Sequence, residues 1–203
     1  MTTNNNNTRQ VPRNALQFSL GAMQFADVQT GEHGPEAPIT MFARSAEPIV
    51  HWYWGRIVHD MAGMKLRKPT CPIDYCHWDA NPIGFLDQFQ AGNDGLTVSG
   101  KLISFKPQDR AHEVIYLGSK GVPYEASIDF GDGQAIIEEI PNGMSVQVNG
   151  YTFTGPGYVV REWSLLGVAV CPFGADPNTN SEFSRHKNDQ NFEVSIFKFS
   201  ESK

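Results

Sequence analysis

The stretch YVVREWSLLGVAVCPFG at residues 158–174 decides the fold, because it reads as one long, largely apolar strand. It is the last of several strand-like segments, after YEASIDFG at 124–131, QAIIEEI at 134–140 and MSVQVNG at 144–150. Glycine, asparagine and proline separate these segments, as is typical of turns between strands. The second half of the chain is therefore predicted to be mainly β-sheet.

The first half is predicted to mix strands with one helix. Apolar and polar residues alternate in NALQFSLGAMQFADVQTG at 14–31, which predicts a strand or hairpin. In SAEPIVHWYWGRIVHDMAGM at 45–64, apolar residues recur at broadly helical spacing, and Ser45 could cap the resulting helix. Shorter strands are predicted in TCPIDYCHW at 70–78 and PIGFLDQFQAG at 82–92.

The segment DGLTVSGKLISF at 94–105 is predicted to be a strand with a bulge or bend at Gly100. A second helix is predicted in QDRAHEVIYLGSKGV at 108–122, ending at Gly118 or Gly121. Many strands with two helices predict an α+β fold, a β-rich barrel of mixed, mostly antiparallel strands flanked by a few helices.

The chain of 203 residues is long enough for one well-buried core. We expect a single domain over residues 14–182. Residues 1–13, rich in asparagine, are expected to be a disordered polar arm. Residues 183–203 are expected to form a polar tail with one possible short strand, FEVSIFKF.

The charge and the apolar content exclude some partners. A net charge of −6 argues against nucleic-acid binding through a general basic field. The one basic cluster, Lys65, Arg67 and Lys68, is typical of a solvated loop. No apolar run approaches the roughly 18 residues of a membrane span, and the N-terminus lacks the apolar core of a signal peptide.

Three cysteines, an odd number, give no complete disulfide framework, which favours a reducing, intracellular setting. Cys71 and Cys76, with His77 directly after, suggest a zinc site at first sight. Their spacing fits no common zinc knuckle, however, and only the distant Cys171 could be a fourth ligand. No metal and no cofactor is expected.

Ser127 lies at the centre of PYEASIDFG, where a serine is ordinarily a small filler of a half-buried strand. A catalytic role would require a base within hydrogen-bond reach and a third group that orients the base. His77 is a candidate base. Strand alternation would place its side chain on the face opposite Asp74, which predicts that Asp74 is a poor partner.

Glu162 is a candidate third group, because it lies in an otherwise apolar strand where a carboxylate needs a satisfied role. Taken alone, His77 is more often a structural histidine and Glu162 a solubilising residue of an edge strand. Asp74, Asp79 or Asp60 could replace Glu162 as the acid. Of these, Asp60 next to His59 is the main rival pair, although adjacent residues on a helix point in different directions.

Four segments in order resemble the head-maturation (prohead) proteases of tailed phages, which are related in fold to the herpesvirus assemblins. The segments are IDYCHW, DGLTVSGKL, YEASIDF and REWSLLGVAVCPFGADPNT, and the resemblance covers roughly residues 72–177. It implies a herpesvirus-protease-like fold and a serine endopeptidase with Ser127 as nucleophile, His77 as general base and Glu162 as orienting acid. Asp129 departs from the pattern, since many relatives have glycine there.

The resemblance also implies the partners. The expected substrates are capsid and scaffolding proteins, and the protease itself, inside the prohead as it assembles in the host cytoplasm. A homodimer or oligomer is expected, with no nucleic acid and no membrane as partner.

Two alternatives remain open. A catalytically inactive capsid scaffold or structural phage protein of the same fold would hold Ser127 and His77 apart. A β-barrel binding module would instead use an open aromatic groove, whose side chains would be Trp52, Tyr53, Trp54 and Trp78.

Overall fold

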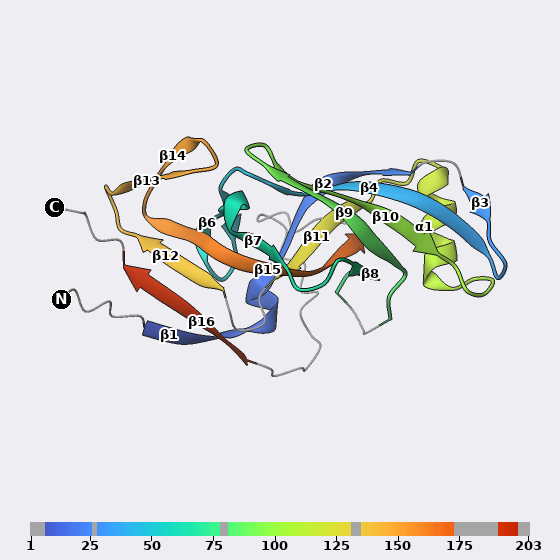
Figure 1. Cartoon of the computed structure of the whole chain (residues 1–203), viewed down its shortest axis with the longest axis horizontal. Helices are drawn as coiled ribbons and strands as arrows, with labels where there is room; N and C mark the ends of the chain where they lie inside the picture. Colours follow the sequence, from blue (N-terminus) through green and yellow to red (C-terminus); the bar gives the residue numbers. More distant parts are fainter. Residues whose placement is uncertain (1–6, 26–27, 78–80, 131–134, 173–190, 199–203) are drawn as a thin grey trace.

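The structure is a computed structural model that describes residues 7–25, 28–77, 81–130, 135–172 and 191–198. Strands dominate it (Figure 1). The described residues contain one α-helix, α1 (Arg110–Ser119), and two short 3-10 helices, η1 (Arg13–Leu16) and η2 (Met61–Gly63). None of the helices there is long and apolar enough to cross a lipid bilayer.

The long strand predicted from residues 158–174 is β15 (Gly157–Cys171), and it lies at the centre of the main sheet. From β15 the paired strands continue through β11, β2, β4, β10, β9 and β8, and β8 pairs with β15 again. The bounds of these strands are β11 (Glu125–Phe130), β2 (Gln17–Phe25), β4 (Pro35–Ser45), β10 (Gly95–Ile103), β9 (Gly84–Gly92) and β8 (Cys71–Tyr75).

The N-terminal half of β15 also pairs with β12, and from β12 the sheet continues through β16 to β1 (Figure 1). The bounds here are β12 (Ile136–Ile140), β16 (Asn191–Lys198) and β1 (Asn7–Pro12). Of the short strands, β3 pairs with β4, β6 and β7 pair with β15, and β5 pairs with β6, whereas β13 and β14 form a separate hairpin. Their bounds are β3 (Gln29–Thr30), β5 (Ile49–His51), β6 (Gly55–His59), β7 (Met64–Leu66), β13 (Ser145–Val148) and β14 (Tyr151–Thr154).

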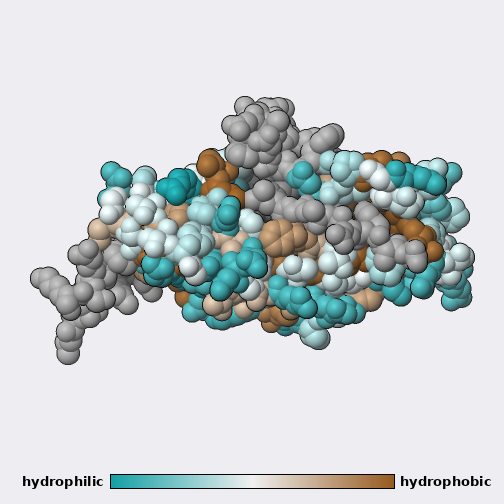
Figure 2. Space-filling view, turned by 90° about the horizontal axis from the view of Figure 1, so that it is seen from above, coloured by the Kyte–Doolittle hydropathy of each residue, from teal (hydrophilic) through white to brown (hydrophobic). Residues whose placement is uncertain are grey.

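Most apolar side chains of these strands enter one continuous core. Along β11, Ala126, Ile128 and Phe130 are buried in it, and α1 adds Ala111, Val114 and Ile115. A smaller cluster lies beside the β13–β14 hairpin and is formed by Val58, Ile140, Val146, Val148, Phe153 and Val159. On the described part of the face in Figure 2, hydrophilic and intermediate residues cover most of the surface.

The predicted α+β fold is confirmed in part: the sheet is mixed and mostly antiparallel, helices are few, and the described residues are mainly β. The strands expected around Gly100 and Ser127 are present, and a register shift between Ser99 and Gly100 marks the expected bulge. The expectation of a barrel needs correction, because β12, β16 and β1 continue the sheet as an open flank and the sheet as a whole is not closed.

The predicted helix over residues 45–64 is wrong. The segment forms the β5–β6 hairpin, in which Ile49 pairs with Ile57 and Val50 with Arg56, followed by η2 and β7. Branched residues at these positions favour strands, and Gly55, at φ +69°, allows the backbone to reverse. The spacing of apolar residues in this segment does not distinguish a helix from a hairpin, because a short hairpin also places apolar residues several positions apart on one face.

The expected boundaries at both ends also need correction. β1 lies within the supposed disordered arm and pairs with β16, which matches the short strand expected in the tail. Val11 and Val194, from opposite ends of the chain, are both fully buried in the main core. The folded unit therefore extends beyond residues 14–182.

Candidate active site

Three neighbouring strands place Ser127 and Asp74 in one row across the sheet. Ser127 of β11 pairs with Ala169 of β15, and Ala169 pairs on its other side with Asp74 of β8. Paired residues on adjacent strands point to the same face of a sheet, at a spacing of about 4.8 Å between strands. Ser127 and Asp74 thus share a face roughly 10 Å apart, with only the methyl group of Ala169 between them.

The chain then turns sharply, so that His77 lies over this row. β8 ends at Tyr75, and Cys76 and His77 both have left-handed backbone conformations, with φ of 58° and 54°. Asp74 stabilises the turn, because its Oδ1 accepts a 2.8 Å hydrogen bond from the His77 backbone N–H. Such side-chain hydrogen bonds to nearby backbone groups are typical of aspartate in turns.

The turn brings the imidazole to the serine. His77 Nε2 and Ser127 Oγ lie 2.8 Å apart, within hydrogen-bond distance. On the other side of the ring, Nδ1 lies 3.7 Å from Asp74 Oδ2, which is close but longer than a hydrogen bond. The Nδ1 atom is buried and has no hydrogen-bond partner among the described residues. Asp74 Oδ2 is therefore placed to accept from Nδ1 after a small rotation.

The pair is almost covered, since Ser127 is 3% exposed and the His77 side chain 9%. Exclusion of water strengthens a hydrogen bond between the hydroxyl and the imidazole. Strand β2, which borders Ser127 on the side away from β15, shifts register against β11 between Glu125 and Ser127. Irregularities of this kind are common beside functional sites.

Asp74 was expected to be a poor partner for His77, and the structure corrects this expectation. Strand alternation would apply only if the strand reached residue 77, whereas it stops at Tyr75 and the backbone reverses. The signal in the sequence was the spacing itself, because an aspartate three residues before a histidine can hydrogen-bond that residue's N–H and form a turn.

Glu162, expected to orient His77, lies elsewhere. It belongs to the same strand β15 but pairs with Ile136, seven positions before the Ala169 that pairs with Ser127. Seven residues of strand correspond to roughly 23 Å. The Glu162 carboxylate, on a side chain that is 44% exposed, accepts instead from Lys65. The structure thus brings together two of the three predicted residues.

The rival pair of His59 and Asp60 does not converge. The His59 ring is fully buried against Phe130 and Trp163, and its Nδ1 accepts a hydrogen bond from Arg44 Nε. The Asp60 carboxylate caps η2 through Ala62 N and accepts from Arg161. Burial, with the Arg44 charge second, holds the pKa of His59 well below its usual value. The third rival acid, Asp79, lies outside the described residues.

The aromatic residues weighed as a binding groove have different environments. Trp54 is buried and its indole N–H donates to Ala15 O, whereas Trp52 is 66% exposed at the β5–β6 turn. The Arg9 guanidinium lies over the rings of Tyr53 and Trp54. Trp78 lies outside the described residues.

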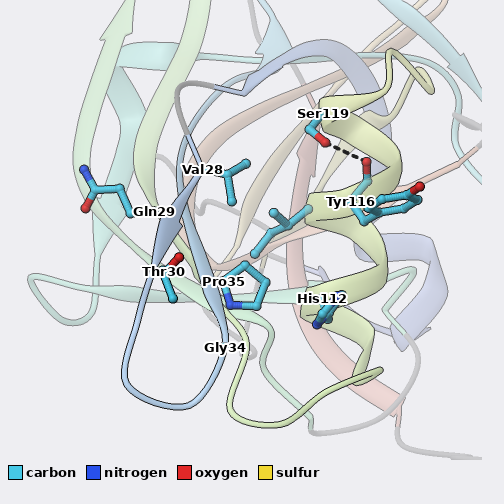
Figure 3. Close-up of a pocket in the computed structure, with 9 residues that line it drawn as sticks. Val28, Gln29, Thr30, Gly34, Pro35, His112, Tyr116 and Ser119 are labelled. Carbon is cyan, nitrogen blue, oxygen red and sulfur yellow. Dashed lines mark hydrogen bonds between the residues drawn. The ribbon is translucent and has the colours of Figure 1, made fainter.

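A cavity of about 340 Å³ lies between α1 and the segment that joins β3 to β4 (Figure 3). His112, Ile115, Tyr116 and Ser119 of the helix line it on one side and Val28 and Pro35 on the other, with the Tyr116 ring pointing away from it (Figure 3). Neither Ser127 nor His77 lines it. In the described residues no group of three or more histidine, cysteine or acidic side chains is arranged to hold a metal ion.

The arrangement of Ser127, His77 and Asp74 is suited to nucleophilic chemistry. A hydroxyl beside an imidazole can lose its proton as it attacks an electrophilic carbonyl, and a carboxylate behind the ring stabilises the cation that forms. Comparisons of this chain with protein-family models, with curated proteins and with solved structures found no match.

Proposed function

We propose that the protein is a serine endopeptidase with Ser127 as nucleophile and His77 as general base, acting in phage head maturation. The observation that supports the proposal most is the 2.8 Å contact between His77 Nε2 and Ser127 Oγ. These residues are 50 positions apart, and four motifs in order led to both of them. We also propose that the strands around β15 are arranged as in the herpesvirus assemblins.

In the proposed mechanism, His77 Nε2 accepts the Ser127 proton while Oγ attacks the carbonyl carbon of a peptide bond. The imidazolium then donates this proton to the leaving amine, and a water molecule releases the acyl group from Ser127 by the same steps in reverse order. Asp74 takes the orienting position in place of Glu162, because its carboxylate is the one beside Nδ1. It favours the tautomer with the proton on Nδ1, which leaves Nε2 free to act as a base.

The proposed substrates are capsid and scaffolding proteins and the protease chain itself. The proposed place of action is the interior of the assembling prohead, in the host cytoplasm, with the protease as a homodimer or oligomer. The chain carries no general basic field, in keeping with protein rather than nucleic-acid substrates.

The test is cleavage of the chain itself and of a co-expressed scaffolding or capsid protein, followed by intact-mass spectrometry. We expect defined fragments with the wild type and none with Ser127→Ala or His77→Ala. Ser119→Ala is the matched control, because Ser119 is exposed on α1 and hydrogen-bonds to Tyr116 O. Equal cleavage by Ser127→Ala would contradict the assignment of the nucleophile.

The alternative of an inactive structural protein of the same fold has one observation in its favour, the 3% exposure of Ser127. Its expectation that Ser127 and His77 lie apart is not met, so under this alternative the Ser127–His77 hydrogen bond would serve only stability. It predicts no fragments from any variant, together with a lower melting temperature for Ser127→Ala.

A further inference from the structure

A second pair of reactive side chains lies directly beside the candidate active site. Cys76 precedes His77 in the turn. Its backbone N–H donates to Val170 O at 3.0 Å, directly after Tyr75 and Val170, the last pair of residues between β8 and β15. The next residue of β15 is Cys171. The Cys76 thiol donates to Val170 O at 3.7 Å, so its sulfur lies against the residue that precedes Cys171, and the Cys171 side chain is a hydrogen-bonding neighbour of the same thiol.

The two thiols differ in a way that suits an exchange reaction. Cys76 is half-buried and Cys171 is buried, so an external reagent meets Cys76 first. The pKa of the Cys76 thiol is lowered, first by the Cys171 side chain and further by Tyr75 and the Arg110 charge, against burial and the Asp74 charge, which act in the opposite direction. A lower pKa increases the fraction of thiolate, the form that attacks disulfides.

Cys71 shows what an ordinary cysteine in this strand looks like. It is buried at the start of β8, its Sγ contacts Leu165 O at 3.8 Å, and burial raises its pKa. It therefore provides a matched control thiol, in the same strand but at the end remote from His77.

We propose that Cys76 and Cys171 form a reversible disulfide that draws His77 away from Ser127, and that a small-molecule disulfide is the oxidant. The inference rests on the proposed function, because the disulfide would switch off the proposed protease activity. In the reduced state the two thiols are neighbours with no covalent bond between them, and the turn holds His77 at Ser127. A covalent bond requires the sulfurs to approach further, so Cys76 moves towards β15 and takes the adjacent His77 with it.

The chemistry balances as two thiol–disulfide exchanges. The Cys76 thiolate attacks one sulfur of the external disulfide, whose S–S bond breaks and releases one thiolate. The Cys171 thiol then loses its proton and attacks the Cys76 sulfur of the mixed disulfide, which releases the second thiolate. Two electrons pass to the external disulfide, and the protons lost by the two cysteines end on the two thiols released.

The test equilibrates the full chain in buffers of reduced and oxidised glutathione, alkylates the free thiols and maps disulfides by mass spectrometry without reduction. The state of the site is followed by histidine side-chain NMR and by the rate at which a small fluorophosphonate labels Ser127. In the wild type and in Cys71→Ala we expect a Cys76–Cys171 cross-link, a shifted His77 ring signal and labelling that is slower by about a hundredfold. All three should reverse with dithiothreitol and be absent in Cys171→Ala.

Absence of the cross-link in the wild type would overturn the proposal, as would a cross-link that leaves the His77 ring signal and the labelling rate unchanged. If Ser127 reacts in neither redox state, the proposed function fails, and the cross-link and the His77 signal still decide the redox switch. The two failures are thus distinguishable.

Discussion

A turn of two consecutive left-handed residues defines the candidate site at the scale of single residues. Without Cys76 and His77 at positive φ, the imidazole would continue along β8 instead of folding back over Ala169. Ser127 and His77 could be predicted from the sequence because their motifs stand in a recognisable order. Strand alternation argues against Asp74, but alternation holds only while the backbone stays extended. The three-residue spacing of Asp74 and His77 is compatible with a turn, yet it does not show that the strand ends before His77.

Replacement of Asp74 tests its role as the positioning residue. Asp74→Asn retains an oxygen that can accept from the His77 backbone N–H but removes the charge beside Nδ1. We expect the rate of Ser127 labelling or of cleavage to fall about 100-fold, with partial recovery in Asp74→Glu and with little change in melting temperature.

Glu162→Gln is the matched control for Asp74→Asn. The Glu162 carboxylate is close to half exposed and pairs with Lys65, so its loss should leave the rate within about twofold of the wild type. A large loss of rate in Glu162→Gln with none in Asp74→Asn would restore the original assignment of the acid.

At the scale of elements, the site depends on the row that β8, β15 and β11 form across the sheet. The sequence indicated each of these strands, but the parallel pairing of β8 with β15 joins segments about a hundred residues apart. Strand periodicity carries no information about such long-range neighbours or their register. For the same reason the sequence predicts a helix where the β5–β6 hairpin lies, since the local pattern is ambiguous and the sheet partner of β6, β15, is distant in the chain.

Ala169 offers a test of this row. Its fully buried methyl group lies between Ser127 and Asp74, below the imidazole that joins them. Ala169→Val adds two methyl groups to that space and should push His77 from Ser127, which lowers the rate of Ser127 labelling at least tenfold.

Thermal unfolding separates this local effect from loss of the fold. Overpacking of this size costs about 1–3 kcal/mol, and Ala169→Ser, a smaller change, should keep most of the rate. Full reactivity in folded Ala169→Val would mean that the row does not determine the position of His77.

At the scale of the whole molecule, strands from both ends of the chain belong to the main sheet, because β1 pairs with β16 and β16 pairs with β12. Polar composition suggested an arm and a tail, whereas the buried side chains of Val11 and Val194 place both in the core. A few apolar residues in a polar segment suffice for a strand once a partner edge is present, and composition alone does not reveal the partner. The core also encloses Arg44 and His59, and this pair links stability to pH.

His59 should make the free energy of unfolding fall as the pH drops below 6.5. Its pKa is well below 6.5 in the folded protein, because of burial first and the Arg44 charge second, so the unfolded chain binds a proton that the folded chain does not. The loss is up to about 1.4 kcal/mol per pH unit between the two pKa values.

Denaturant titrations at pH 7 and pH 5 measure this difference. His59→Asn keeps an acceptor for Arg44 Nε and cannot titrate, so its stability should depend less on pH than that of the wild type. The exposed His33 is the control, and His33→Asn should change nothing. An unaltered pH dependence in His59→Asn would contradict the assignment.

The most direct test of the central claim is the site at which a small fluorophosphonate labels the protein, identified by peptide mass spectrometry. We expect one adduct, on Ser127, formed by the wild type and by His33→Ala but slowed at least a hundredfold in His77→Ala. A small reagent is preferred because the Ser127 hydroxyl is nearly covered. No adduct on Ser127, or one that forms equally fast without the His77 imidazole, would contradict the account.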